Sequence, residues 1–252
     1  MAETTDIGWT DSTHNPWWGC SAVSPGCDHC YAEAMDRRTG GDYWGPHARP
    51  RPMSNANWRN PLRWERAYAA FEAEHGRRRR VFAGSMCDWA DKNAPLGQRD
   101  RLFDVIRQTP HLDWQLLTKR APNIAKYLPP DWGAGYDNVW LGVTVENRKH
   151  GLRRIDVLRR TPAKVRFLSI EPLLEDLGEL DLTGIHWVIV GGESGPGARQ
   201  MDPAWAEAIR RQCEEQGVAF FFKQQGGTKR DKGGTRLGGR EYKQWPIYLA
   251  AA

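Results

Sequence analysis

The sequence lacks any apolar run approaching the roughly 18 residues that a membrane-spanning helix needs. Its opening residues, MAETTDIGWTDSTHN, have neither the basic segment nor the apolar stretch of a secretory signal. No internal repeat of about 20 to 50 residues is present, which excludes the repeat architectures. We therefore expect a cytoplasmic protein with no membrane contact.

Cysteine is scarce, with five residues in a chain of 252. An odd number of cysteines in a chain of this size does not indicate the disulfide framework that small secreted domains require. A reducing compartment is therefore expected, in which the thiols serve metal binding or chemistry.

The composition is that of a globular protein, with 40% hydrophobic and 27% charged residues and a modest net charge of +5. The length favours a single domain over residues 1–252, with an N-terminal segment at 1–60 and a basic, glycine-rich tail at 226–252. Tryptophan is abundant: seven of the 13 precede residue 90. Because an indole N–H seeks a partner, this excess indicates pockets, stacking surfaces or a crowded site.

Short β-rich runs alternate with segments of helical period. The expected strands cover residues 7–10, 81–86, 114–117, 139–145, 165–170, 187–190 and 218–222. The expected helices cover residues 98–108, 151–160 and 202–216, the last with Asp202 as N-cap and Pro203 in its first turn. This alternation predicts an α/β fold with parallel strands, as a complete or partial (β/α) TIM-type barrel. A doubly wound sheet is the alternative.

Polar or glycine-rich residues follow the expected strands. The corresponding stretches are residues 86–88, 118–120, 144–147, 169–172, 191–194 and 223–225. In a parallel barrel these ends open on one mouth, where active sites lie, so the pattern predicts an enzyme-like polar cavity. The plain alternative is that strands end where polar loops begin.

Three of the five cysteines stand within eleven residues, as Cys20-x6-Cys27-x2-Cys30. Helix-favouring residues follow directly, which places Cys30 at a helix N-terminus, where the dipole stabilises negative charge. Three thiolates without a fourth fit a [4Fe–4S] cluster with one iron open. A zinc site completed by His29 or His14 is the first alternative, and three unrelated buried thiols are the second.

Motifs along most of the chain carry a family resemblance. They are Ile7-Gly8-Trp9-Thr10-Asp11, Asn15-Pro16, Gly19-Cys20, Pro25-Gly26-Cys27, Cys30-Tyr31-Ala32-Glu33, Leu117-Thr118-Lys119-Arg120, Gly142 to Asn147, Ser169 to Leu173, Gly191 to Gly195 and Phe222-Lys223-Gln224. Together they resemble a phage-associated, uncharacterised family of radical-SAM-type proteins, distantly similar to spore photoproduct lyase. The usual first gap in the radical SAM superfamily is three residues, whereas here it is six.

The resemblance implies a radical-SAM-like barrel in which Cys20, Cys27 and Cys30 ligate three irons. S-adenosylmethionine (SAM) would bind the fourth iron through its amino and carboxylate groups. One electron from a flavodoxin- or ferredoxin-type donor would cleave the sulfonium, and the 5′-deoxyadenosyl radical would abstract hydrogen from a substrate.

SAM needs acceptors for its ammonium group and donors for its carboxylate. The expected cofactor contacts, all at strand ends, are Ser85, Asp88, Thr144, Glu146 and Glu171.

The candidate catalytic residues are Cys87, Lys119 and Glu193. A thiol at position 87 would return hydrogen to a product radical, although cysteine is also among the most buried residue types. Lys119 is either a pocket cation or a solvated strand end. Glu193 follows a glycine pair that lets backbone approach a ligand, and it is expected to face the substrate.

Basic and aromatic residues suggest one substrate class. Arg77 to Arg80 and the tail cations would contact phosphates, and Trp44, Trp58 and Trp64 would stack on bases. A nucleotide or nucleic acid is therefore one substrate class, beside a small metabolite or a protein side chain. Two other functions stay open: a zinc-stabilised nucleic-acid-binding module, and a barrel that has lost SAM cleavage.

Overall fold

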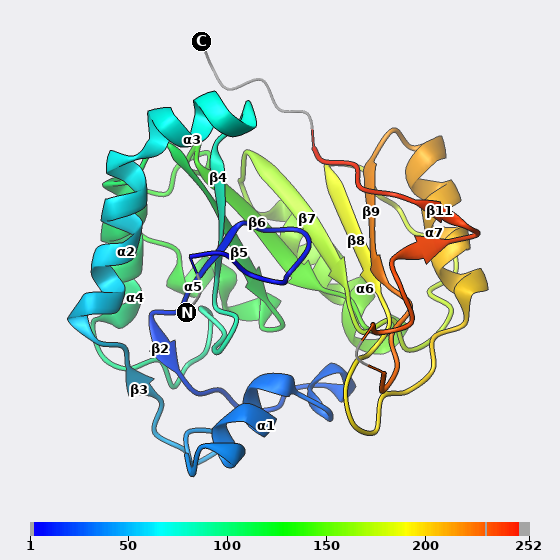
Figure 1. Cartoon of the computed structure of the whole chain (residues 1–252), viewed down its shortest axis with the longest axis horizontal. Coiled ribbons are helices and arrows are strands. Elements are labelled where there is room, and N and C mark those ends of the chain that lie inside the picture. Colours follow the sequence, from blue (N-terminus) through cyan, green and yellow to red (C-terminus); the bar gives the residue numbers. More distant parts are fainter. Residues whose placement is uncertain (1–2, 230, 247–252) are drawn as a thin grey trace. The chain divides into compact units, whose positions relative to one another are not determined.

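The computed structural model describes residues 3–229 and 231–246 (Figure 1). The chain forms two compact units. Unit 1 comprises Met1–Ala22, Ala32–Leu141 and Pro162–Lys164, and unit 2 comprises Val23–Tyr31, Gly142–Thr161 and Val165–Ala252.

Unit 1 is built on three parallel strands. They are β1 (Ser12–His14), β4 (Arg79–Ala83) and β5 (Leu112–Thr118). Ser12 lies opposite Val81, and Arg79 lies opposite Leu112. Almost every residue of these strands is buried, as expected for parallel strands covered on both faces. The expected strands at 81–86 and 114–117 are therefore present, with shifted ends.

The expected strand at 7–10 is wrong. This segment is a turn, in which the Thr10 N–H donates to the Ile7 carbonyl over 3.1 Å. The first strand begins at Ser12, and all three of its residues are buried although none is aliphatic. A search for apolar runs misses such a polar strand. The Ser12 hydroxyl keeps a polar partner although it is buried, because it donates to the Glu3 carbonyl over 2.6 Å.

The helices described in unit 1 are α1 (Tyr31–Arg38, of which Tyr31 belongs to unit 2), α2 (Asn55–Arg66), α3 (Tyr68–His75), α4 (Gln98–Arg107) and the short α5 (Ile124–Tyr127). Of these, α2 packs on β5 and α3 packs on β4. The helix expected at 98–108 is confirmed as α4, and it buries Leu102, Phe103, Val105 and Ile106. α2 was not expected; the Ser54 hydroxyl caps it by accepting from the Asn57 N–H. A short antiparallel pair joins β2 (Trp17–Trp18) to β3 (Arg51–Pro52).

Unit 2 repeats the strand and helix alternation. Its strands are β7 (Val165–Ile170), β8 (Trp187–Gly191) and β9 (Ala219–Gln224), and its helices are α6 (Arg148–Arg160) and α7 (Pro203–Glu215). β8 pairs in parallel with β7 and with β9. The start expected for α7 is confirmed: the Asp202 carboxylate accepts from the Ala204 N–H over 2.8 Å, and Pro203 is the first helical residue.

Strand β6 (Val139–Thr144) contributes residues to both units. The strand order is β1-β4-β5-β6-β7-β8-β9, which follows the order along the chain. A doubly wound sheet reverses its order at a switch point, whereas a (β/α) barrel does not. The prediction of an α/β fold with parallel strands is confirmed, and the order is that of a partial (β/α) barrel.

The tail expected at 226–252 contains the hairpin of β10 (Arg236–Leu237) and β11 (Arg240–Glu241). Leu237 is buried and anchors it, while Lys229, Lys232 and Arg240 are exposed. Arg230 and residues 247–252 of this tail lie outside the described residues. In the described part of the chain, no helix combines the length and apolar character that crossing a membrane requires.

His14 is a wholly buried imidazole on β1, packed edge-on against Trp58 and Trp114 with ring centroids 4.9 and 5.6 Å away. Neither ring nitrogen has a hydrogen-bond partner among the described residues. Burial lowers the pKa of His14 to about 3, and the positive charge of Arg101 contributes. Between about pH 3 and pH 6.5, His14 is therefore neutral in the folded protein but protonated in the unfolded chain.

We expect this difference to remove stability as the pH falls from 6.5 toward 3. Between pH 7 and pH 4 the loss due to His14 amounts to about 3 kcal/mol in the free energy of unfolding. In His14→Phe this part of the loss disappears, whereas the exposed control His47→Phe keeps it. Urea unfolding of the three proteins at both pH values measures the difference. An equal loss in His14→Phe and the unmutated protein would contradict it.

Candidate functional site

In unit 1, the residues that follow β4 and β5 converge on the buried carboxylate of Asp88. Its Oδ1 accepts from the Thr118 hydroxyl over 2.6 Å, and its Oδ2 accepts from the Lys119 N–H over 3.0 Å. Asp88 is 6% exposed. Asp88, which was expected to contact the cofactor, therefore links the segments that follow β4 and β5.

Arg120 is the centre of this cluster. Its guanidinium, 8% exposed, donates to Asp88 over 3.0 Å and lies 2.8 Å from an Asp91 carboxylate oxygen. It also donates to the Ser21 carbonyl and hydroxyl over 2.8 and 2.9 Å, and to the Cys20 sulfur over 3.5 Å. Burial works against the charge, but the surrounding carboxylates outweigh it and raise the pKa of Arg120. A permanent cation therefore stands beside the first cysteine of the motif.

The Cys20 thiol is strongly affected by its surroundings. Burial raises the pKa of Cys20 to about 12, although the charge of Arg120 acts in the opposite direction. The thiol is consequently protonated at neutral pH in the metal-free protein. Binding a metal would require loss of this proton, and Arg120 supplies the positive charge that the resulting thiolate needs.

Ser85 and Cys87 lie on the turn that follows β4, and Asn15 organises that turn. The Asn15 amide donates to the Ser85 hydroxyl over 2.9 Å, and its carbonyl accepts from the Met86 N–H over 2.7 Å. The Cys87 thiol, which is buried, contacts the same carbonyl oxygen at 4.0 Å. Burial raises the pKa of Cys87 well above the ordinary value, so it is a neutral thiol rather than a nucleophile.

The side chain of Lys119 is half-buried, and in the part of the chain that the structure describes it makes no ion pair. Its backbone, not its ammonium, binds Asp88. The ammonium therefore stays available to a ligand carboxylate or phosphate.

In unit 2, Cys27 ends the short 3-10 helix Pro25–Cys27, and Cys30 directly precedes Tyr31, the first residue of α1. The expectation that Cys30 lies at a helix start is confirmed. All five cysteines are free thiols.

The loop before Cys27 rests on Glu146, which follows β6. Glu146 is wholly buried, and its carboxylate accepts from Arg154 over 2.5 Å. The same guanidinium donates to the Thr144 carbonyl and to the Ser24 hydroxyl, each over 2.9 Å. A Cβ at Gly26 would lie 3.2 Å from Glu146, so glycine allows the loop to approach. Of the two expected cofactor contacts, Glu146 therefore supports the cysteine loop, and Thr144 contributes its backbone carbonyl to Arg154.

A second ion-pair group holds the loop from β8. Glu193 is 6% exposed, and its Oε2 lies 2.8 Å from His29 Nδ1 and 2.9 Å from Arg199 Nε. Arg199 also donates to the Pro25 carbonyl over 2.7 Å and to the Asp28 carboxylate over 3.1 Å. Burial opposes the charged form of Glu193, but these hydrogen bonds outweigh it and lower the pKa of Glu193 to about 2. The expected substrate-facing residue is in fact an anchor for the residues around Cys27.

Glu171, at the end of β7, pairs with β9 across the strand between them. Lys223 Nζ lies 2.5 Å from its Oε1, and the Gln224 amide donates to the same oxygen over 3.2 Å. A Cβ at Gly191 of β8 would lie 3.4 Å from Lys223 and 3.5 Å from Glu171. Both charged side chains are partly exposed, at 17% and 18%, so this pair can exchange partners with a ligand.

The residues that sequence reasoning missed are mostly arginines. Arg120, Arg154 and Arg199 each join a strand-end carboxylate to the segment that carries the cysteines. Arg120 belongs to the Thr118-Lys119-Arg120 motif, which was the available signal for it. Nothing local in the sequence marks Arg154 or Arg199, because their partners in the loop lie 130 and 174 residues away.

Among the described residues, no three His, Cys, Asp or Glu side chains are grouped so that they could hold a metal ion. Cys20 belongs to unit 1, and Cys27 and Cys30 belong to unit 2. The donor chemistry nevertheless suits an iron–sulfur cluster, because all three thiols are free and a buried guanidinium adjoins one of them. His14, one zinc alternative, is enclosed by tryptophans, and His29, the other, is bound to Glu193.

We expect Arg199→Gln to loosen the loop around Cys27 and Cys30. Glutamine cannot reproduce the charged bonds to the buried Glu193, which contribute about 1.5–3 kcal/mol when intact, whereas the exposed pair with Asp28 contributes at most about 1 kcal/mol. Alkylation of the two thiols by iodoacetamide in the reduced, metal-free protein should then speed up about fivefold. Mass spectrometry of the individual cysteines measures these rates.

The matched control is Arg210→Gln, which removes a guanidinium that pairs with Glu207 and Glu214 along α7 of the same unit. It should leave the rates at Cys27 and Cys30 unchanged. Equal rates in Arg199→Gln and the unmutated protein would show that the loop does not depend on this anchor.

Comparison with known proteins assigns the sequence to a family. No curated protein and no solved structure matches the chain. One family profile, described as a protein of unknown function (DUF5131), matches residues 4–246. Because this match spans nearly the whole sequence, the chain belongs to the DUF5131 family.

Proposed function

We propose that this protein is a radical SAM-type enzyme, with a [4Fe–4S] cluster held by Cys20, Cys27 and Cys30. One observation carries the proposal. Within its own unit, each cysteine segment is tied by a buried or half-buried arginine to carboxylates at the carboxyl ends of parallel strands. In (β/α) barrels these strand ends form the active site.

When bound, the cluster would supply one electron for reductive cleavage of SAM, which yields a radical able to abstract hydrogen from a substrate. The chain's own residues prepare for this. Arg120 would compensate the negative charge of a Cys20 thiolate, and the Glu193 and Arg199 pair fixes the backbone around Cys27. Because Cys87 is a buried neutral thiol, it keeps the hydrogen that a product radical would need.

Among the expected cofactor contacts, Glu171 has the best environment for SAM. Its carboxylate is partly exposed and would accept from the ammonium of the methionine moiety. Lys223, released from that carboxylate, would take the SAM carboxylate. Ser85 and Asp88 line the end of β4, while Glu146 remains beneath the loop.

The proposal includes an electron donor, a compartment and a substrate class. A flavodoxin- or ferredoxin-type protein in the cytoplasm would deliver the electron. The substrate class is a nucleotide or nucleic acid, and the half-buried Lys119 ammonium offers a contact for its phosphate.

Anaerobic purification should give a brown protein with about four irons and as many acid-labile sulfides. Dithionite and SAM should then yield 5′-deoxyadenosine. Cys27→Ala should lose both the iron and the product. Cys213→Ala, which alters a fully buried thiol on α7, should keep both. Iron and sulfide analysis and chromatography of the nucleoside measure these outcomes.

Two results would overturn the proposal. A colourless protein that holds one zinc after anaerobic reconstitution would indicate the zinc-stabilised nucleic-acid-binding module instead. A protein that takes up the cluster but never cleaves SAM would be a barrel without this activity.

A further inference from the structure

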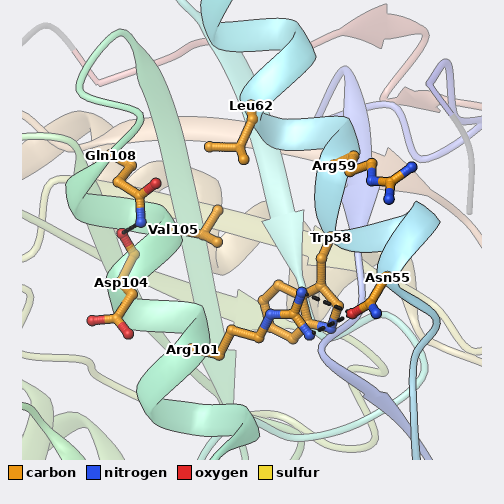
Figure 2. Close-up of a pocket in the computed structure, with 8 residues that line it drawn as sticks. All are labelled: Asn55, Trp58, Arg59, Leu62, Arg101, Asp104, Val105 and Gln108. Carbon is orange, nitrogen blue, oxygen red and sulfur yellow. Dashed lines mark hydrogen bonds between the residues drawn. The ribbon is translucent and has the colours of Figure 1, made fainter.

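A hollow of about 470 Å³ lies between helices α2 and α4 of unit 1 (Figure 2). None of the residues expected for catalysis or cofactor binding lines it. Its volume falls within the range of small-molecule sites, which is about 300–1,000 Å³. The hollow is therefore large enough for one nucleotide.

Arg101 of α4 is the principal charged group of this hollow. Its two terminal nitrogens both lie 3.1 Å from the Asn55 amide oxygen, and its guanidinium lies over the Trp58 ring at 4.5 Å. Figure 2 shows these three side chains together at one end of the hollow. In the described part of the chain Arg101 makes no ion pair. A guanidinium that shares one neutral oxygen retains most of its capacity to bind an anion.

The surroundings increase the positive charge. Arg59, Arg63 and Arg66 recur at helical spacing along α2, and the described residues offer Arg59 and Arg66 no ion-pair partner. Asp104 also lines the hollow, but its carboxylate already binds Arg107 of α4. The acidic residue therefore does not cancel the charge of Arg101 and Arg59.

The rest of the lining suits a flat, partly apolar group. Leu62 and Val105 face each other from the two helices (Figure 2). Trp58 is only 2% exposed, so a ligand would stack on the guanidinium that covers it rather than on the indole. The Asn55 oxygen accepts from Arg101, which leaves the amide N–H groups to donate to a ligand.

We propose that this hollow binds a nucleotide unit, with its base on Arg101 beside Leu62 and its phosphate toward Arg59. Bases stack on arginine planes, and guanidinium groups bind phosphates in a bidentate manner. The unit can come from a free nucleotide or from a single strand, since both present a base and a phosphate. The site does not depend on the iron–sulfur cluster, so the metal-free protein tests it.

The test is fluorescence anisotropy of a short labelled single-stranded oligonucleotide, titrated with metal-free protein at about 0.15 M salt. Arg101→Gln should weaken binding about tenfold, because it removes both the stacking plane and a charge. Arg59→Gln should weaken binding about threefold by removing a phosphate contact at an exposed position that folding does not require. Thermal unfolding confirms that each variant is folded.

Arg153→Gln is the matched control, because this exposed arginine of α6 lies in unit 2 and carries the same charge. It should bind like the unmutated protein. Competition by AMP would identify a free nucleotide as a ligand. If AMP does not compete but Arg101→Gln loses binding of the strand, the ligand is a single strand. Either outcome supports the site.

Three results would overturn the proposal. The first is an equal loss in Arg153→Gln and Arg101→Gln, which would mean binding to net charge alone. The second is competition by polyglutamate as strong as that by the unlabelled oligonucleotide, which would point to an acidic peptide. The third is no binding at all. None of these results bears on iron content or SAM cleavage, so this inference and the proposed enzyme can fail separately.

Discussion

Arginine–carboxylate pairs at the ends of parallel strands are the constraint on which the rest of this structure depends. Arg120 with Asp88 and Arg154 with Glu146 bring opposite charges into a dehydrated setting, and Arg199 with Glu193 buries the carboxylate while the guanidinium stays partly exposed. Removing water from such charges costs free energy that their attraction only partly returns, while removing one partner is strongly destabilising. Their main effect is therefore to fix geometry, because each arginine has one arrangement that satisfies all its partners. In each case one of those partners belongs to the cysteine-bearing segment.

The fold was largely predictable from sequence, because buried parallel strands are apolar runs that end at polar residues. β7 matches its expected bounds, and β4, β5, β6, β8 and β9 differ only at their ends. β1 was misplaced because its residues, Ser12 to His14, are polar and yet buried. α2 went unseen for a related reason: Pro61 and several arginines interrupt the apolar pattern, while Trp58 and Trp64 supply its buried face. Both errors occur where a polar or aromatic group replaces an aliphatic one in the core.

The candidate site was predictable in its residue types but not in their partners. Spacing alone drew attention to Cys27 and Cys30, and strand ends drew attention to Glu193 and Glu146. What these carboxylates contact depends on Arg154 and Arg199, which lie 130 and 174 residues from their partners in the loop. Arg154 also belongs to a helix whose sequence pattern is that of an amphipathic surface helix. No local pattern distinguishes a carboxylate that meets a ligand from one that anchors a loop. Only burial and the identity of the donor separate Glu171 from Glu146.

The abundant tryptophans affect both the core of unit 1 and the hollow between α2 and α4. Trp17, Trp58, Trp64 and Trp89 are nearly or wholly buried, and none of their indole N–H groups has a partner among the described residues. They therefore act as large apolar volumes. Such volumes allow short polar segments to be packed without a conventional aliphatic core, as His14 between Trp58 and Trp114 illustrates. The ring of Trp58 also packs against the guanidinium of Arg101. The same tryptophan therefore packs against buried His14 of β1 and holds a planar cation at the hollow between α2 and α4.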